Sequence, residues 1–393
     1  MLEHIHRIAE LAAALGTLSS IAFCLLCIWS AAGFLGESRS KAAGGSARPT
    51  QAQTPAVSIL KPLKGTDPGM YESLRSHCLQ DYPDYEIIFG VSDPNDPAIA
   101  LVTRLQAEFP QRTIRLVVCR EDLGANTKVS NLAQMLPQAR YEYLIVNDSD
   151  IRVEPDYLHK VVPPLTDPAV GMVTCLYRAV AGPTLGSRLE SLGISTDFIA
   201  GVLAARQLEG IRFGLGSTLA FRRRDLEAIG GFEALADYLA DDYELGSRIA
   251  ARGLKVILSG SIVETFLPSY RMGAFLDHQL RWARTIRDSR RWGYFGLGLT
   301  FGLPWALLAV ALAQGAAWAW ALLGAVCVVR AAMSLIVGRS VLRDRQVWQF
   351  LWLLPLRDLI ALFVWLASFA GHTISWRDET FTLAKGKLTR TES

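Results

Sequence analysis

Two parts of the sequence are apolar without interruption by a charged residue, and each is long enough to enter a membrane. They are residues 11–36 and residues 292–329. A membrane-spanning helix needs about 20 apolar residues, so the first run predicts one span. The second run is too long for one helix and predicts a tight hairpin of two spans that turns near Gly315. A third apolar run, 347–370, is broken by a proline and by adjacent opposite charges, and it fits either a further span or a re-entrant segment.

Between these runs, short apolar segments alternate with segments whose apolar residues have helical spacing. The predicted strands are 57–60, 86–91, 114–118 and 143–147, and the predicted helices include 69–80 and 97–109. Strands that alternate with helices predict an α/β domain with a mostly parallel sheet covered by helices. Ligands of such sheets bind beyond the carboxyl ends of the strands, so candidate chemistry is sought there.

The same pattern divides the chain into successive segments. We expect an N-terminal transmembrane anchor at 1–36, a flexible linker at 37–55 that is rich in small and polar residues, and the α/β domain at 56–271. After it we expect a basic amphipathic helix on the membrane surface at 272–291, a transmembrane hairpin at 292–338, a further membrane segment at 346–372, and a tail at 373–393.

Charge and cysteine content narrow the class of protein. The net charge of +3 is small, and basic residues do not alternate with aromatic ones, so we expect no nucleic-acid partner. Arg7 precedes the first apolar run, whereas Arg39, Lys41 and Arg48 follow it, which places the α/β domain in the cytoplasm by the positive-inside rule. The six cysteines form no metal-binding pair, which fits a reducing compartment.

Carboxylates follow two of the predicted strands. The strand at 86–91 leads to Asp93, and the strand at 143–147 leads to Asp148-Ser149-Asp150. Mg²⁺ and Mn²⁺ prefer carboxylate and phosphate oxygens, so two aspartates separated by one residue could bind one ion together with a diphosphate. Aspartates at strand ends also cap turns, and the pattern alone favours neither interpretation.

Three further features are candidates for the same site. Asp241 and Asp242 begin a predicted helix, where either could act as a general base, although the helix dipole alone favours acidic residues there. Lys128 could reach a phosphate or be solvated. Gly216 lies in a glycine-rich turn that would let the backbone approach a sugar.

Seven short motifs follow one another along the chain, and together they resemble the motifs of a known family. The motifs are ILKPLKG at 59–65, DYP at 81–83, DPAI at 96–99, NTKVSNL at 126–132, DSDIRV at 148–153, ADDY at 240–243 and TISWR at 373–377. They resemble the ceramide glucosyltransferase family (family 21) of inverting GT-A glycosyltransferases over about residues 56–378. The bacterial branch associated with hopanoid biosynthesis looks most similar. The resemblance implies a Rossmann-like GT-A domain.

The resemblance also implies roles for the acidic residues. Asp93 would lie near the uracil of a UDP-sugar, and Asp148 and Asp150 would bind a divalent metal (Mg²⁺ or Mn²⁺) and the diphosphate. Asp242, rather than Asp241, matches the family's catalytic base. Asp241 is left as a candidate contact to donor or acceptor.

A second family motif begins with Gln or Arg and ends with Arg-Trp. This chain has His278 at the first position, which departs from the family and leaves the role of His278 open. Arg281 and Trp282 match, and they would bind the diphosphate and line the acceptor site. Lys128 would contact the donor, and Gly216 and His278 are candidate contacts to donor or acceptor.

The resemblance implies inverting transfer of one sugar from a UDP-sugar to a membrane-lipid hydroxyl, at the cytoplasmic face of a bacterial inner membrane. The branch favours transfer of N-acetylglucosamine to a hopanoid (bacteriohopanetetrol), and a ceramide glucosyltransferase is the nearest alternative. A processive polysaccharide synthase would need more spans to line a polymer channel. A non-catalytic, nucleotide-binding membrane protein would not need every acidic position of the motif.

Overall fold

The computed structural model describes residues 1–43, 54–376 and 379–390, which form two compact units. The sheet unit consists of Ser40–Val180, Gly210–Pro268 and Gly386–Ser393. The helical unit consists of Met1–Arg39, Ala181–Glu209 and Ser269–Lys385. Each unit is therefore assembled from separate stretches of the chain.

The sheet unit is built on one mixed, mostly parallel sheet with the order β3-β2-β1-β4-β7-β6-β8-β5. Its strands are β1 (Val57–Pro62), β2 (Tyr85–Val91), β3 (Thr113–Val118), β4 (Tyr143–Val146), β5 (Ile151–Arg152), β6 (Val170–Val180), β7 (Leu219–Arg222) and β8 (Lys255–Phe266). Strands β1 to β4 are mutually parallel, β7 is antiparallel to β4 and β6, and β6 is parallel to β8. The predicted α/β class is confirmed.

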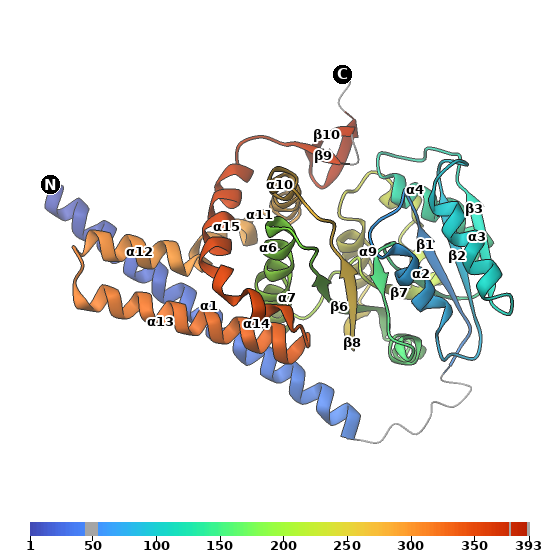
Figure 1. Ribbon diagram of the computed structural model, residues 1–393, viewed down its shortest axis with the longest axis horizontal. Helices are drawn as coiled ribbons and strands as arrows, with labels where there is room; N and C mark the ends of the chain where they lie inside the picture. The colour runs from blue at the N-terminus through green and yellow to red at the C-terminus, as the bar shows by residue number, and fades with distance from the viewer. Residues whose placement is uncertain (44–53, 377–378, 391–393) are drawn as a thin grey trace. The chain divides into compact units, whose positions relative to one another are not determined.

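Helices pack against both halves of this sheet. They are α2 (Met70–Cys78), which contacts β5, α3 (Ala98–Glu108), α4 (Thr127–Met135) and α5 (Tyr157–Val161), which contacts β8; α8 (Arg223–Glu227) and α9 (Asp241–Ala251) come after β7. Helix α3 packs on β2 and β3, and α4 packs on β1 and β2 (Figure 1). Every residue of β1 and β2 is buried, as expected of parallel strands covered on both sides. Gly90 lets α4 approach, because a methyl group there would lie 2.3 Å from the sulfur of Met135.

The helical unit contains the long apolar helices. They are α1 (Leu2–Ala43), α6 (Leu185–Gly193), the π-helix η4 (Ile194–Phe198), α7 (Ile199–Glu209), α10 (Met272–Ser289), α11 (Arg291–Gly296), α12 (Gly302–Leu312), α13 (Ala317–Ser334), α14 (Gln346–Phe350) and α15 (Leu354–Ser368). Strands β9 (Thr373–Trp376) and β10 (Glu379–Ala384) form an antiparallel pair. Helix α1 continues through 37–43, where the sequence predicts a linker; residues 44–53 of that predicted linker lie outside the described residues.

Three helical segments among the described residues are long and apolar enough to cross a membrane: Leu2–Ser40, Ala317–Val341 and Gln346–Ser368. A fourth candidate consists of Arg291–Thr300 and Gly302–Leu312, which are bent by 49° relative to each other. Helices α12 and α13 pack side by side (Figure 1). Gln314 and Gly315 connect them with φ angles of 51° and 76°, a left-handed turn that glycine adopts without strain.

The charges that interrupt the third apolar run are paired inside the helical unit. Arg330 of α13 bonds Asp358 of α15 at 2.8 Å, and it also bonds Asp197 of η4. Arg357 lies 3.5 Å from the same Asp197. Charges at membrane depth are costly unless they are paired, and this cluster supplies each with an opposite charge.

Candidate active site

Lys128 joins two of the predicted acidic positions. Asp148 follows β4, and its carboxylate lies 2.8 Å from the ammonium of Lys128. The same ammonium lies 3.0 Å from the carboxylate of Asp241, the first residue of α9. Asn126 caps α4 by accepting a hydrogen bond from the Val129 amide, which fixes the helix turn that carries Lys128.

Gly216 brings a third carboxylate to the same place. Its amide donates to Oδ2 of Asp242 at 2.7 Å, and the amide of Tyr243 donates to Oδ1 at 2.8 Å. A methyl group at Gly216 would lie 3.0 Å from Oδ2 of Asp148 and 3.3 Å from Oδ2 of Asp242. Only backbone therefore lies between the carboxylates of Asp148 and Asp242, and five predicted positions form one cluster.

The pKa values of two carboxyl groups in this region are raised. Burial raises the pKa of Asp150 to about 6, with a further contribution from the charge of Asp148. Burial also raises the pKa of Asp242 to about 6, and the charge of Asp241 adds to the effect while Lys128 opposes it. Perturbed carboxyl groups gathered in this way are typical of catalytic and metal-binding sites.

Lys128 remains protonated in these surroundings. Burial alone would lower the pKa of its ammonium, but the charges of Asp148, Asp241 and Asp242 outweigh burial and raise that pKa. A fixed positive charge therefore lies between the aspartates, where it can also attract a phosphate group.

The aspartates offer oxygen ligands that fit a divalent metal ion. No group of three or more His, Cys, Asp or Glu residues suited to a metal occurs in the described part of the chain. Asp148 and Asp150 lie close enough for their charges to repel, and 40% of the Asp148 side chain is exposed. Mg²⁺ typically uses one or two carboxylates and takes its other ligands from substrate phosphates and water. The pair fits such an ion when a diphosphate is bound as well.

Asp93 lies at the same edge of the sheet as Asp148. It follows β2, which runs parallel to β4 with β1 between them. The side chain is exposed, and its carboxylate accepts a hydrogen bond from the Asn95 amide at 2.8 Å. Its predicted contact with a uracil stays a prediction.

His278, Arg281 and Trp282 lie on α10, which belongs to the helical unit. Nδ1 of His278 is 2.8 Å from a carboxylate oxygen of Glu190, and the His278 ring lies 5.5 Å from that of Trp282. Trp282 also contacts Phe198, with ring centroids 5.7 Å apart. Where the family motif has Gln or Arg, this chain therefore has a histidine that pairs with the buried Glu190 of the helical unit. The predicted donor and acceptor contacts of these residues stay predictions.

Several residues that touch the aspartates were not predicted from the sequence. Lys61 of β1 is fully buried, and its ammonium donates to the carbonyl of Asp148 at 2.9 Å. Burial lowers the pKa of Lys61 to about 7, opposed by the charges of Asp150 and Asp148. Thr265 of β8 donates to the Asp150 carboxylate. The sequence does contain a sign of the role of Lys61, because a lysine is rarely found inside an apolar strand.

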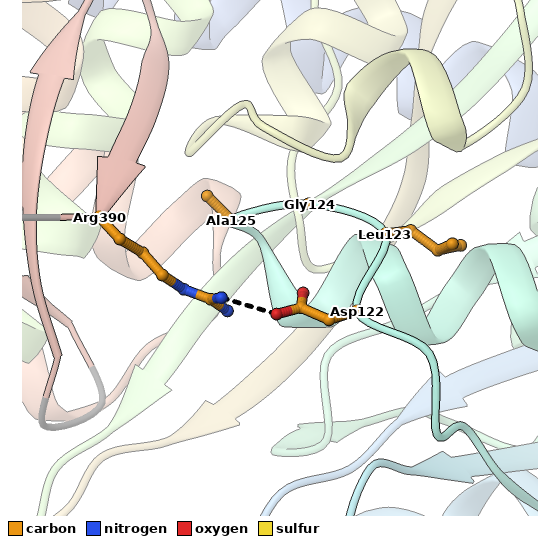
Figure 2. Close-up of a pocket in the computed structure, with 5 residues that line it drawn as sticks. All are labelled: Asp122, Leu123, Gly124, Ala125 and Arg390. Atoms are coloured by element: carbon orange, nitrogen blue, oxygen red, sulfur yellow. Dashed lines mark hydrogen bonds and ion pairs between the residues drawn. The ribbon is translucent and has the colours of Figure 1, made fainter.

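The loop that leads to Lys128 borders a shallow pocket that is open to the surface (Figure 2). The pocket has a volume of about 280 Å³ and is lined by Asp122, Leu123, Gly124, Ala125 and Arg390. Arg390 belongs to β11 (Lys387–Arg390), and its guanidinium bonds the Asp122 carboxylate at 2.6 Å.

Strand β11 also contacts the loop that leads to α9. The amide of Leu388 donates to the Asp237 carbonyl at 2.7 Å, and the Leu239 amide donates to the Gly386 carbonyl at 3.1 Å. The loops before Lys128 and before Asp241 therefore share β11 as a neighbour.

Comparison with known proteins gives consistent results. The model of "Glycosyl transferase family 21" matches residues 12–389. Ceramide glucosyltransferase 3 of Caenorhabditis elegans is 25% identical over 351 residues, which cover 84% of this chain and 73% of that protein. The ceramide glucosyltransferase of Komagataella phaffii is 36% identical over 109 residues, 27% of this chain and 21% of that protein.

One solved structure supports the fold. It is a mannosyltransferase from Pyrobaculum calidifontis in complex with GDP-Man and Mn²⁺, with a TM-score of 0.54 and 19% sequence identity. The match covers 92% of this chain and 99% of that one. It agrees with the predicted GT-A type of fold.

Proposed function

Because the chain belongs to glycosyl transferase family 21, we propose that this glycosyltransferase moves one sugar, with inversion, from a UDP-sugar to a membrane-lipid hydroxyl. The observation that carries the proposal is the cluster of Lys128, Asp148, Asp241 and Asp242 around the backbone of Gly216. This cluster brings together groups that could bind a diphosphate, bind a cation and accept a proton.

Asp148, Asp150 and Lys128 would bind the diphosphate of the donor. Asp148 and Asp150 would hold a divalent cation with oxygens of the donor diphosphate, and Lys128 would contact a phosphate as a point charge. Such an ion, when bound, offsets the negative charge of the departing UDP. Asp93, at the neighbouring strand end, would contact the uracil.

Asp242 would act as the general base for the acceptor hydroxyl. Its carboxylate takes the proton of the lipid hydroxyl while the hydroxyl oxygen attacks the anomeric carbon and the bond to UDP breaks. A single displacement of this kind inverts the anomeric configuration. With a pKa of about 6, Asp242 is ionised at neutral pH and is a stronger base than an exposed carboxylate. The amides of Gly216 and Tyr243 fix its orientation.

We further propose that the acceptor is a hopanoid polyol, bacteriohopanetetrol, and the donor UDP-N-acetylglucosamine. The motif resemblance to the hopanoid-associated branch supports this choice, and the ceramide glucosyltransferases among the relatives support ceramide and glucose as the alternative. The apolar helices and the basic residues after the first one support a membrane protein with a cytoplasmic catalytic domain, and the resemblance to the bacterial branch supports the bacterial inner membrane.

The test is transfer by the purified full-length protein in lipid nanodiscs with Mg²⁺ or Mn²⁺. UDP-N-acetylglucosamine and UDP-glucose are each offered with bacteriohopanetetrol or ceramide, and products are identified by mass spectrometry and by NMR of the anomeric proton. We expect N-acetylglucosaminyl bacteriohopanetetrol with inverted configuration. Glucosylceramide would replace the acceptor assignment, and failure of all four pairs would contradict the proposed function.

A further inference from the structure

Two buried side chains donate hydrogen bonds to the backbone of the Asp148-Ser149-Asp150 segment. Lys61 donates from its ammonium to the Asp148 carbonyl at 2.9 Å, and the Ser73 hydroxyl of α2 donates to the Asp150 carbonyl at 3.1 Å. Both side chains are fully buried. Because they bind carbonyl groups, they occupy none of the carboxylate oxygens, of which Lys128 contacts one on Asp148 and Thr265 contacts one on Asp150.

His77 connects these two supports. Its Nδ1 lies 2.9 Å from the Ser73 carbonyl, which can only accept, so Nδ1 carries the proton. The unprotonated Nε2 therefore faces the ammonium of Lys61 at 3.5 Å and accepts from it. His77 is also fully buried. Polar contacts thus link the Asp148 carbonyl through Lys61 and His77 to the backbone carbonyl of Ser73, and the side-chain hydroxyl of the same serine bonds the Asp150 carbonyl.

We propose that Lys61, His77 and Ser73 are positioning residues that set the spacing of the Asp148 and Asp150 carboxylates for a divalent cation. The inference rests on the proposed function, since it assumes that these aspartates bind a cation with the diphosphate. Groups that orient metal ligands through hydrogen bonds commonly change metal affinity by about 10–100-fold when they are removed.

A simple electrostatic role for Lys61 predicts the opposite effect on affinity. If the ammonium only balanced the two carboxylates, its removal would take away a charge that repels the cation, and affinity would rise. If Lys61 positions Asp148, removal frees the segment and affinity falls. The sign of the change therefore separates the two roles.

The experiment measures Mn²⁺ binding to the full-length protein in detergent micelles with UDP present, using electron paramagnetic resonance of free Mn²⁺. The variants are Lys61→Met and Ser73→Ala, the second of which changes no charge. Ser58→Ala is the matched control, because Ser58 is a fully buried serine of β1 whose hydroxyl bonds Glu86 at 2.7 Å instead. Thermal unfolding gives the folded fraction of each variant.

We expect Lys61→Met and Ser73→Ala to weaken Mn²⁺ binding by about 10–100-fold, and Ser58→Ala to leave it within twofold while lowering the unfolding temperature. Unchanged or tighter binding by the folded Lys61→Met variant, or unchanged binding by Ser73→Ala, would overturn the positioning role. If Lys61→Met does not fold, Ser73→Ala decides alone. If the wild-type protein binds no Mn²⁺, the proposed metal site fails and the inference fails with it.

Discussion

Replacing Asp242 by asparagine removes the proposed base with almost no change of shape. The asparagine keeps one oxygen that can accept from the Gly216 or the Tyr243 amide, and it loses the second acceptor. A general base typically contributes about 10²–10⁴-fold to a rate, so transfer should fall by that factor. Binding of UDP in the presence of Mn²⁺ should stay within a few-fold of wild type.

The same substitution should not destabilise the folded protein. A rise in the pKa of Asp242 from 3.8 to about 6 corresponds to about 3 kcal/mol of unfavourable ionisation in the folded state. A neutral side chain removes this cost, while the lost hydrogen bond to an amide costs about 1.5–3 kcal/mol. We therefore expect the free energy of unfolding to be unchanged or up to about 1.5 kcal/mol higher.

The assay is transfer of radiolabelled sugar to lipid at saturating donor, combined with thermal unfolding of the same samples. Asp241→Asn is the matched control, because Asp241 pairs with Lys128 and is not the proposed base. Transfer by Asp242→Asn within tenfold of the wild-type rate would refute the assignment. A larger loss for Asp241→Asn would refute it as well, and a loss explained by unfolded protein would contradict the expected stability of the variant.

Four further predictions concern the site and the helical unit. The value of kcat/KM should fall about tenfold per pH unit below about pH 6 and level off above it, because Asp242 acts only when deprotonated; a flat profile between pH 4.5 and 7 would contradict this. Asp150→Asn should abolish detectable Mn²⁺ binding yet raise the unfolding temperature of the metal-free protein, since burial makes the ionised carboxylate unfavourable. Gly216→Ala should lower transfer about tenfold without lowering the unfolding temperature, because the added methyl displaces groups at 3.0 Å and 3.3 Å by a few tenths of an ångström. Arg330→Met should cost about 3–5 kcal/mol of stability in detergent because the buried Asp358 loses its ion pair, and adding Asp358→Leu should restore part of it.

The parallel half of the sheet could be predicted because its signals are local. Strands β1 to β4 and helices α2 and α3 each have an apolar period and a turn signal within their own residues, and the predicted ranges differ from the observed ones by one or two positions. The other half depends on distant pairing. Strand β7 lies antiparallel between β4 and β6, and no local pattern states which strands become neighbours.

The residues of the candidate site also fall into a predicted group and a group that was not predicted. The sequence motifs identified Lys128, Asp148 and Asp242, and the fold brings these three residues together around Gly216. Ser73 and Thr265 each make one hydrogen bond to Asp150, and His77 contacts Lys61 and the Ser73 backbone; these residue types are common at buried helix and strand positions. Only the folded chain identifies them.

The place of β11 in the chain sets an order for biosynthesis. The loops before Lys128 and Asp241 bond with β11, which is made only after Ser269–Lys385 of the helical unit. At about 5–20 residues per second, synthesis of that stretch takes on the order of ten seconds, during which the nascent sheet unit has every other strand but not this one. A chain whose translation stops before β11 therefore carries all the proposed reacting groups, but their two loops lack the contacts made last.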